Sequence, residues 1–344
     1  MNFVRSKIAY TLFGLSLSAQ VILLPLIDSI IVNSIILLLV LGGFLFVSQY
    51  KLLGGFGKLI FIVGLFSSLL DGGVLGPAIS FIPFVGFLFL PLSLTRLNLH
   101  SNYYQKIDIL VVFSILVGAW IAYYQFGLHV VNLLSQLYLY LIILNFIFIG
   151  KANQLTVLLC VSAALISNPG GIGSNRSSVF LLLSLISNEN FLWLKNKVWG
   201  ISASKIFKFM VVITLLFSLV FIIYSNPKFH TDYEEVRFLW WQEIITFDPE
   251  MIFYNLSNLG PLLYPFNPHN SFLYMLLYEG IPGLVKVVLF AISSFSIPFG
   301  LWLAIFLRSF LDSFFLVGGH GIIFFLFLNS QFFRLKNLRG SRTF

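Results

Sequence analysis

Charged residues are scarce in this chain of 344 residues. Asp, Glu, Lys and Arg make up only 9% of it, whereas they form roughly a quarter of an ordinary soluble domain. Apolar residues account for 59% of the sequence. This composition excludes an ordinary soluble protein and predicts one that lies in a lipid bilayer.

Cysteine is almost absent as well, because Cys160 is the only one. A single cysteine inside an apolar run excludes an intrachain disulfide and a thiolate metal cluster. The sequence also lacks a His-Glu-x-x-His pattern and a close group of Asp and His residues that could hold zinc. We therefore expect neither a metal ion nor a cofactor.

Long apolar runs, by contrast, recur from one end of the chain to the other. About twenty apolar residues in a helix cross a hydrocarbon core of roughly 30 Å. A run such as "SIIVNSIILLLVLGGFLFV" is apolar on every face, which excludes the alternation of a membrane barrel. The sequence predicts an all-α, polytopic helical membrane protein that forms one integral membrane domain over residues 1–344. About twelve transmembrane helices are expected, at roughly 8–26, 29–49, 59–73, 76–95, 109–125, 130–150, 153–168, 177–194, 209–225, 282–297, 298–315 and 319–333.

The charges that are present indicate the orientation of these spans. We interpret the N-terminal stretch "MNFVRSKIAYTLFGLSLSAQ" as an uncleaved first span, with a cleaved signal peptide as the alternative. With both termini inside, all twelve Asp and Glu residues except Asp108 and Glu189 fall on the outer side. The twenty Lys and Arg residues fall on the cytoplasmic side, as the positive-inside rule requires, with five exceptions. These exceptions are candidates for a role other than topology: Arg176, Lys228, Arg237, Lys286 and Arg308.

Only one connection is long, the outer loop at about 226–270. Its stretch "HTDYEEVRFLWWQEIITFDPE" begins with a capping box and predicts a short helix. Arg237 and Trp241 share one face of this helix, with Trp240 beside them. This face suits a sugar diphosphate, because a guanidinium can bind it through two hydrogen bonds. The alternatives are an interfacial helix anchored by the tryptophans and a local ion pair for the arginine.

A second outer feature is the turn "SNPGGIGSNRSS" at 167–178. Its Ser-Asn pair is placed to cap the apolar helix that follows, with Arg176 in the first turn. Such a helix end attracts anions. A plain tight turn explains the glycines but does not explain an arginine on the outer side.

The third outer feature is "NPHNSFLYMLLYEGIPG" at 267–283. An N-cap followed by proline predicts a helix over 268–279, roughly 18 Å long, that ends at Gly280, with Pro282 opening the next span. His269 and Asn270 lie in its first turn. The partial positive charge there favours a neutral imidazole, which can accept a proton. The alternative is a histidine that only forms hydrogen bonds in a loop.

Three further polar residues rank lower. Lys286 either extends its ammonium to the outer surface or pairs with Glu279. Arg308 has the spacing of an ion pair with Asp312. His320, in "GGHG", is expected in a turn near the outer surface.

These stretches together resemble the O-antigen ligase and O-antigen polymerase superfamily. The resemblance rests on "SNRSSVFLLL", "EEVRFLWWQEII" and "PHNSFLYMLLYEGIPG", and "LRSFLDSFF" is similar to members on the polymerase side. It covers roughly residues 150–330. It implies a metal-independent membrane glycosyltransferase whose donor is a polyprenyl-diphosphate-linked glycan. An Arg followed by Gly at fixed spacing, described for some polymerases, is missing here.

The resemblance also implies roles for individual residues. His269, oriented by Asn270, matches the family's essential histidine, and Arg176 and Arg237 match the residues that hold the diphosphate. Beyond the resemblance, we predict that Glu279 orients the catalytic histidine or binds the acceptor. Arg308 is a further candidate for the diphosphate, and Trp240 and Trp241 are candidates for stacking on sugar rings. The implied reaction is polymerisation of lipid-linked repeat units of O-antigen, capsule or exopolysaccharide on the periplasmic side of a bacterial inner membrane. A flippase and a chain-length regulator are the expected protein partners. The alternatives are a ligase that moves the glycan to lipid A core or protein, and a transporter of lipid-linked oligosaccharides.

Overall fold

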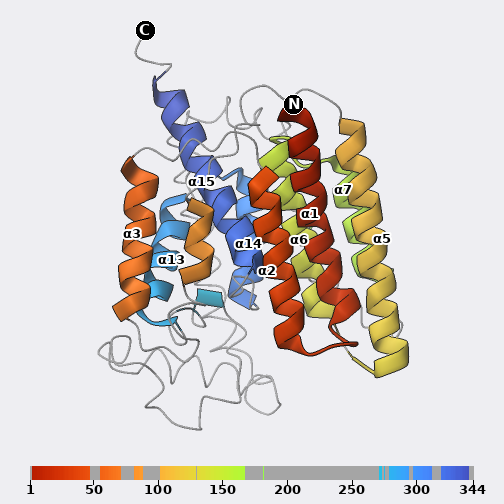
Figure 1. Cartoon of the computed structure of the whole chain (residues 1–344). Helices are drawn as coiled ribbons and strands as arrows, with labels where there is room; N and C mark the ends of the chain where they lie inside the picture. Colours follow the sequence, from red (N-terminus) through yellow and green to blue (C-terminus); the bar gives the residue numbers. More distant parts are fainter. Residues whose placement is uncertain are drawn as a thin grey trace, which may run out of the picture.

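The computed structural model describes residues 2–46, 55–70, 81–87, 101–128, 130–166, 181, 271–272, 275, 279–293, 297–311 and 319–340. Nearly all of these residues are helical and none of them lies in a strand (Figure 1). The prediction of an all-α fold is therefore confirmed for this part of the chain.

The helices lie where the apolar runs predict them. Their bounds are α1 (Asn2–Leu23), α2 (Ser29–Phe46), α3 (Gly55–Leu70), the 3₁₀ helix η1 (Ile82–Phe87), α5 (Ser101–Phe126), α6 (Val131–Phe148), α7 (Gln154–Ile166), α13 (Ile281–Ser293), α14 (Phe299–Leu311) and α15 (Gly319–Gly340). The predicted span at 209–225 and the outer loop at 226–270 lie outside the described residues, as does the span at 177–194 apart from Leu181. The predicted number of spans accordingly stays a prediction.

Three of these helices are long and apolar enough to cross a membrane: Val4–Leu23, Ser29–Phe46 and Asn102–Phe126. The helices α6, α7, α13 and α14 are apolar but shorter. With 13 residues, α13 is about 20 Å long, less than a hydrocarbon core of roughly 30 Å. The crossing predicted over 282–297 is thus a shorter helix than the sequence indicates.

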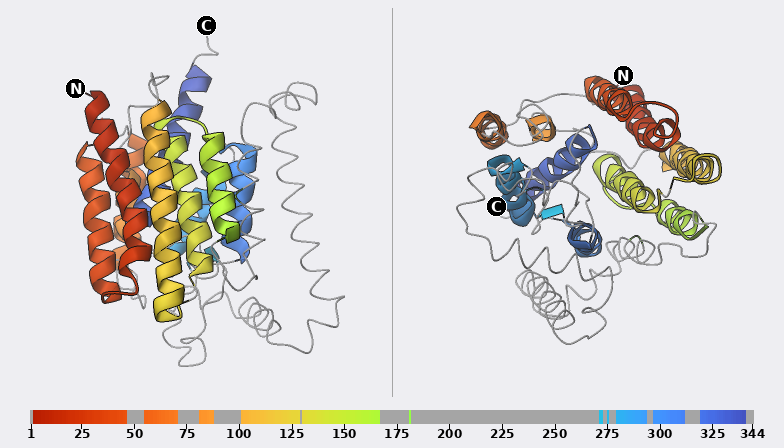
Figure 2. Two further views of the ribbon diagram at one scale, coloured as in Figure 1. Left: turned by 90° about the vertical axis from the view of Figure 1, so that its right-hand side faces the viewer. Right: turned by 90° about the horizontal axis from the view of Figure 1, so that it is seen from below.

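The helices form a bundle in which α6 and α15 are the most enclosed (Figure 2). Around them, α1 packs against α2 and α5, and α15 also packs against η1. The start of α1 and the end of α15 lie at the same end of the bundle (Figure 1).

The outward faces of the peripheral helices are apolar. Large hydrophobic side chains such as Leu38 and Leu45 of α2, Phe66 of α3 and Phe113 of α5 are exposed. Contiguous apolar surface of this kind is unusual on soluble proteins. It is compatible with a membrane protein whose outer helices contact lipid.

Candidate functional site

Most of the predicted site lies outside the described residues. This applies to His269, Asn270, Arg176, Arg237, Trp240 and Trp241, and their roles stay predictions. The structure does describe Glu279 and Arg308, together with the chain around Glu279.

The helix that precedes Glu279 ends where the sequence predicts. Ser271, Phe272, Met275 and Glu279 are helical, and α13 begins directly after Gly280. Gly280 has φ 57°, a left-handed conformation that glycine adopts without steric cost and that is common after a helix. The predicted stop at Gly280 is confirmed.

A second glycine lets the two helices approach closely. If Gly283 carried a Cβ atom, that atom would overlap the carbonyl group of Met275 and would lie 3.2 Å from the Cβ of Glu279. The backbone of the preceding helix therefore passes over Gly283 at a distance that no other residue permits.

The chain folds back on itself at Gly280. The contacts pair residues across progressively longer stretches: Glu279 with Lys286, Met275 with Gly283, and Phe272 with Phe290, whose ring centroids are 5.7 Å apart. This is the pattern of two helical segments that run back along each other. We refer to the described part of residues 271–293 as the helical hairpin.

A buried ion pair joins the two arms of the helical hairpin. The Lys286 ammonium donates a hydrogen bond to a carboxylate oxygen of Glu279, and the two side chains are 3% and 1% exposed. The ammonium also lies 5.6 Å from the ring centroid of Phe84, within the range of a cation–π interaction. Of the two alternatives for Lys286, pairing with Glu279 is confirmed.

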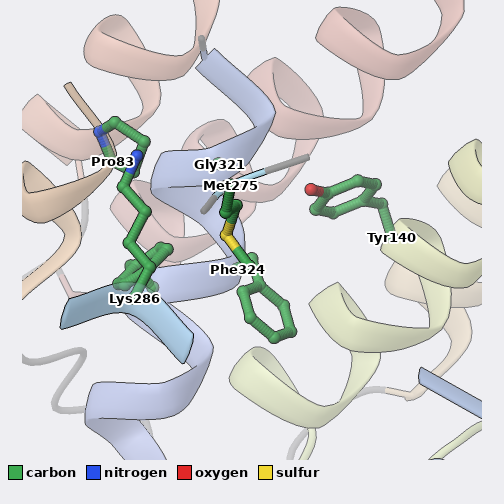
Figure 3. Close-up of a pocket in the computed structure, with 7 residues that line it drawn as sticks. Pro83, Tyr140, Met275, Lys286, Gly321 and Phe324 are labelled. Atoms are coloured by element: carbon green, nitrogen blue, oxygen red, sulfur yellow. The ribbon is translucent and has the colours of Figure 1, made fainter. Parts of the chain in front are cut away.

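The helical hairpin reaches well into the bundle. Lys286 and Met275 line a small pocket together with Tyr140, which lies across it (Figure 3). Because Tyr140 lies near the middle of α6, this pocket is close to the mid-depth of that helix. The charges of Lys286 and Glu279 are consequently in the interior of the protein.

Two polar residues near this region are also buried. Arg308, in the last turn of α14, is 4% exposed, and its predicted partner Asp312 lies outside the described residues. His320 does not form a surface turn, so that prediction is wrong. It lies in the first turn of α15 and is buried, with its ring centroid 5.5 Å from that of Tyr140. The glycines around His320 indicated a turn, but they allow a close-packed helix start equally well.

A second polar group, which the sequence analysis does not predict, surrounds Asp108. Tyr10 and Thr156 donate hydrogen bonds from their hydroxyls to its two carboxylate oxygens. The amide of Asn145 donates to Asp108 Oδ2 over 3.2 Å and to the Tyr10 hydroxyl over 3.1 Å. This Asp108 network joins α1, α5, α6 and α7, and Asp108 is fully buried.

The charge pattern predicts Asp108 at the cytoplasmic end of its span, as one of the two inward carboxylates. The signal that could have found the network is a carboxylate several residues inside a long apolar helix, since such a group needs partners from neighbouring helices. Three neutral donors on one carboxylate hold these helices in a fixed arrangement.

The described residues contain no group of three or more His, Cys, Asp or Glu side chains that could hold a metal ion. Comparison of the chain with protein-family models, curated proteins and solved structures gives no match.

Proposed function

We propose that this chain is a membrane glycosyltransferase that polymerises polyprenyl-diphosphate-linked glycan repeat units. The observation that carries the proposal is the helical hairpin at the end of the "PHNSFLYMLLYEGIPG" stretch. Two described residues of this stretch, Met275 and Glu279, are buried inside the bundle, where Lys286 pairs with the carboxylate. The polar residues His269 and Asn270 begin the same stretch, as expected for a site formed where a substrate in the membrane meets the outer loop.

The proposed reaction transfers a glycan from one lipid carrier to another sugar. A hydroxyl oxygen of the acceptor repeat unit forms a bond to the anomeric carbon of the donor, and the bond from that carbon to the polyprenyl diphosphate breaks. His269, held by Asn270, accepts the hydroxyl proton. The leaving diphosphate keeps the bonding electrons, and its growing negative charge is stabilised by arginine side chains.

The remaining candidate residues serve binding. Arg176 and Arg237 hold the diphosphate, with Arg308 as a further candidate, and Trp240 and Trp241 stack against sugar rings. No step of this reaction requires a metal ion or a cofactor.

The proposed location is a bacterial inner membrane, with the active site on the periplasmic side and both termini in the cytoplasm. The apolar outward faces of α2, α3 and α5 support a location in a bilayer. The start of α1 and the end of α15 lie at the same end of the bundle, which supports placing both termini on one side of the membrane (Figure 1). A flippase that delivers repeat units and a chain-length regulator are the proposed partners.

His269→Ala in the native host tests the function. The control is His129→Ala, because no role is proposed for this histidine, which falls between α5 and α6 in the sequence. We expect His269→Ala to accumulate single lipid-linked repeat units, which mass spectrometry of extracted lipids measures, and His129→Ala to leave the glycan unchanged. Wild-type glycan in the His269→Ala strain would contradict the proposal.

The same experiment separates the two alternatives. A ligase shares the donor chemistry, and its loss leaves long lipid-linked polymer instead of single repeats. A transporter is favoured by one observation, because the Asp108 network is a polar group inside the bundle, as transport sites are. That alternative predicts that Asp108→Asn, and not His269→Ala, stops glycan production.

A further inference from the structure

The helices α1 and α5 lie side by side and run in the same direction (Figure 1). Their contacts follow one order along both helices, as in parallel packing: Lys7 with Tyr103, Tyr10 with Asp108, and Val21 with Gly118. Both helices also carry exposed large hydrophobic side chains. The pair therefore contributes to the apolar outward surface of the bundle.

On each of these two helices a lysine precedes the exposed apolar residues. On α5, Lys106 is exposed, and the exposed Leu110 and Phe113 follow it at helical spacing on the same face. On α1, the half-buried Lys7 precedes the exposed Leu15 by eight residues, or about two turns. We refer to Lys7, Leu15, Lys106, Leu110 and Phe113 as the α1–α5 seam.

The aromatic residues of α5 indicate how deep these lysines lie in a bilayer. Trp120 and Tyr124 are exposed near one end of the helix, and Tyr103 is half-buried near the other. Tyr103 and Tyr124 are 21 residues apart, or about 31 Å along the helix, which matches a hydrocarbon core of roughly 30 Å. Because tryptophan and tyrosine gather at membrane–water interfaces, Tyr103 and its neighbour Lys7 lie at the level of the lipid headgroups.

Lys7 is held in place by Tyr103 and Thr11. Its ammonium lies 4.6 Å from the centroid of the Tyr103 ring, within the range of a cation–π interaction. The Thr11 hydroxyl donates its proton to the carbonyl oxygen of Lys7 over 2.9 Å. The Tyr103 hydroxyl, 2.9 Å from that of Thr11, is therefore the donor in the hydrogen bond between the two. Ring and ammonium are thus ordered before a ligand binds, which lowers the entropic cost of binding.

The three carboxylates that the structure describes lie away from the α1–α5 seam. Asp28 follows α1 at its opposite end, and Asp108 is buried within its network. The third, that of Glu279, pairs with Lys286. Positive charge at headgroup depth attracts anionic lipids. The positive-inside rule explains lysines on this side of the membrane, but it requires neither an ordered ammonium nor exposed apolar side chains beside it.

We propose that the α1–α5 seam binds an anionic phospholipid of the surrounding bilayer. Lys106 lies nearly one turn after Tyr103 on α5, so its ammonium and that of Lys7 can reach one phosphate group. The acyl chains then lie on the three apolar residues of the seam. This inference rests on the location in a bilayer and is independent of glycan transfer.

Native mass spectrometry of the full-length protein in detergent tests the proposal. The protein is titrated with anionic phosphatidylglycerol, with phosphatidylcholine of the same acyl chains, which has no net charge, and with glycerol phosphate, which has no acyl chains. The variants are Lys7→Gln, Lys106→Gln and the double variant. Lys58→Gln is the matched control, because it removes an exposed lysine from the first turn of α3, which lies away from the seam (Figure 2).

We expect the wild type to bind phosphatidylglycerol about 25-fold more tightly than phosphatidylcholine, since each lysine near the surface contributes about fivefold. Each single variant should lose about fivefold in its affinity for phosphatidylglycerol, and the double variant should bind both lipids alike. Lys58→Gln should bind as the wild type does. Because Lys106→Gln replaces an exposed side chain, its result stands even if Lys7→Gln lowers the melting temperature.

Equal affinity of the wild type for the two phospholipids would overturn the proposal, as would an unchanged preference in the double variant. An equal loss in Lys58→Gln would overturn it too, because the effect would then belong to surface charge in general. If glycerol phosphate binds as tightly as phosphatidylglycerol, the seam binds an anion rather than a lipid, and the proposal is wrong. None of these measurements involves a glycan, so failure of the proposed function leaves them unchanged.

Discussion

Replacement of Gly283 by alanine tests the helical hairpin directly. A Cβ atom at this position would lie inside the 3.0 Å that Cβ atoms keep from other heavy atoms, and the atoms it meets are the carbonyl carbon and oxygen of Met275. A backbone carbonyl cannot rotate away as a side chain can. The preceding helix must therefore shift as a unit, and the contacts of Glu279 shift with it.

The expected loss is that of an overpacked core, about 1–3 kcal/mol in the free energy of unfolding. At about 2–4 °C per kcal/mol, the melting temperature should fall by about 2–12 °C. Gly42→Ala is the matched control, because it too lies within a helix and its added Cβ would meet only Leu12 Cδ1 at 3.7 Å, an ordinary contact. An alanine in an open helical position should be neutral or should stabilise the protein by up to about 1 kcal/mol.

The only cysteine of the chain provides the assay. Cys160 is fully buried in α7, so a maleimide reagent should modify it only when the bundle opens, and the temperature of half-modification reports unfolding. Detergent-solubilised wild type, Gly283→Ala and Gly42→Ala are compared at increasing temperature. If Gly283→Ala and Gly42→Ala are modified at the same temperature as the wild type, the close passage of the two helices is refuted.

The Asp108 network gives two further predictions, both measured by the same cysteine assay. Asp108→Asn should lower the free energy of unfolding by about 1–3 kcal/mol, because an amide group has one acceptor oxygen fewer for the donors around it. Asp28→Asn is the control and should leave the free energy of unfolding unchanged. Asp28 is exposed and accepts a hydrogen bond from the Ile30 amide, and asparagine caps helices equally well. Tyr10→Phe removes a hydroxyl and should lower the free energy of unfolding by about 1–2 kcal/mol, whereas Tyr124→Phe on the surface should leave it unchanged. If a network variant and its control unfold at the same temperature, the network is contradicted.

The sequence predicts the helical part of this fold well because its signals are local. Apolar length sets where helices lie, and the stop after Glu279 follows from the conformational preference of Gly280 and from Pro282. The confirmed Glu279–Lys286 pair was one of two alternatives. Glu279 and Lys286 are seven residues apart on the two sides of a turn, so their charges meet only if the chain folds back. That fold depends on the close approach of Gly283 to the carbonyl group of Met275.

What the sequence could not show depends on which helices become neighbours. Asp108 lies in α5 and Asn145 lies 37 residues later in the next helix, α6, while Tyr10 is 98 residues from Asp108. No spacing rule links such residues, so the sequence predicts only a carboxylate at the end of its span. The burial of His320 was missed for the same reason, because it depends on Tyr140 of α6 packing over its ring.

The Asp108 network also constrains the order in which the chain can enter the membrane that we propose for it. When α5 leaves the ribosome, Asp108 faces lipid unless α1 is already beside it, and its remaining donors arrive only with Asn145 of α6 and Thr156 of α7. A charged group in lipid is costly, so α5 is expected to stay close to the insertion machinery until residue 156 has been synthesised. The four helices of the network would then be released together as one unit, before the part of the chain for which we propose catalysis.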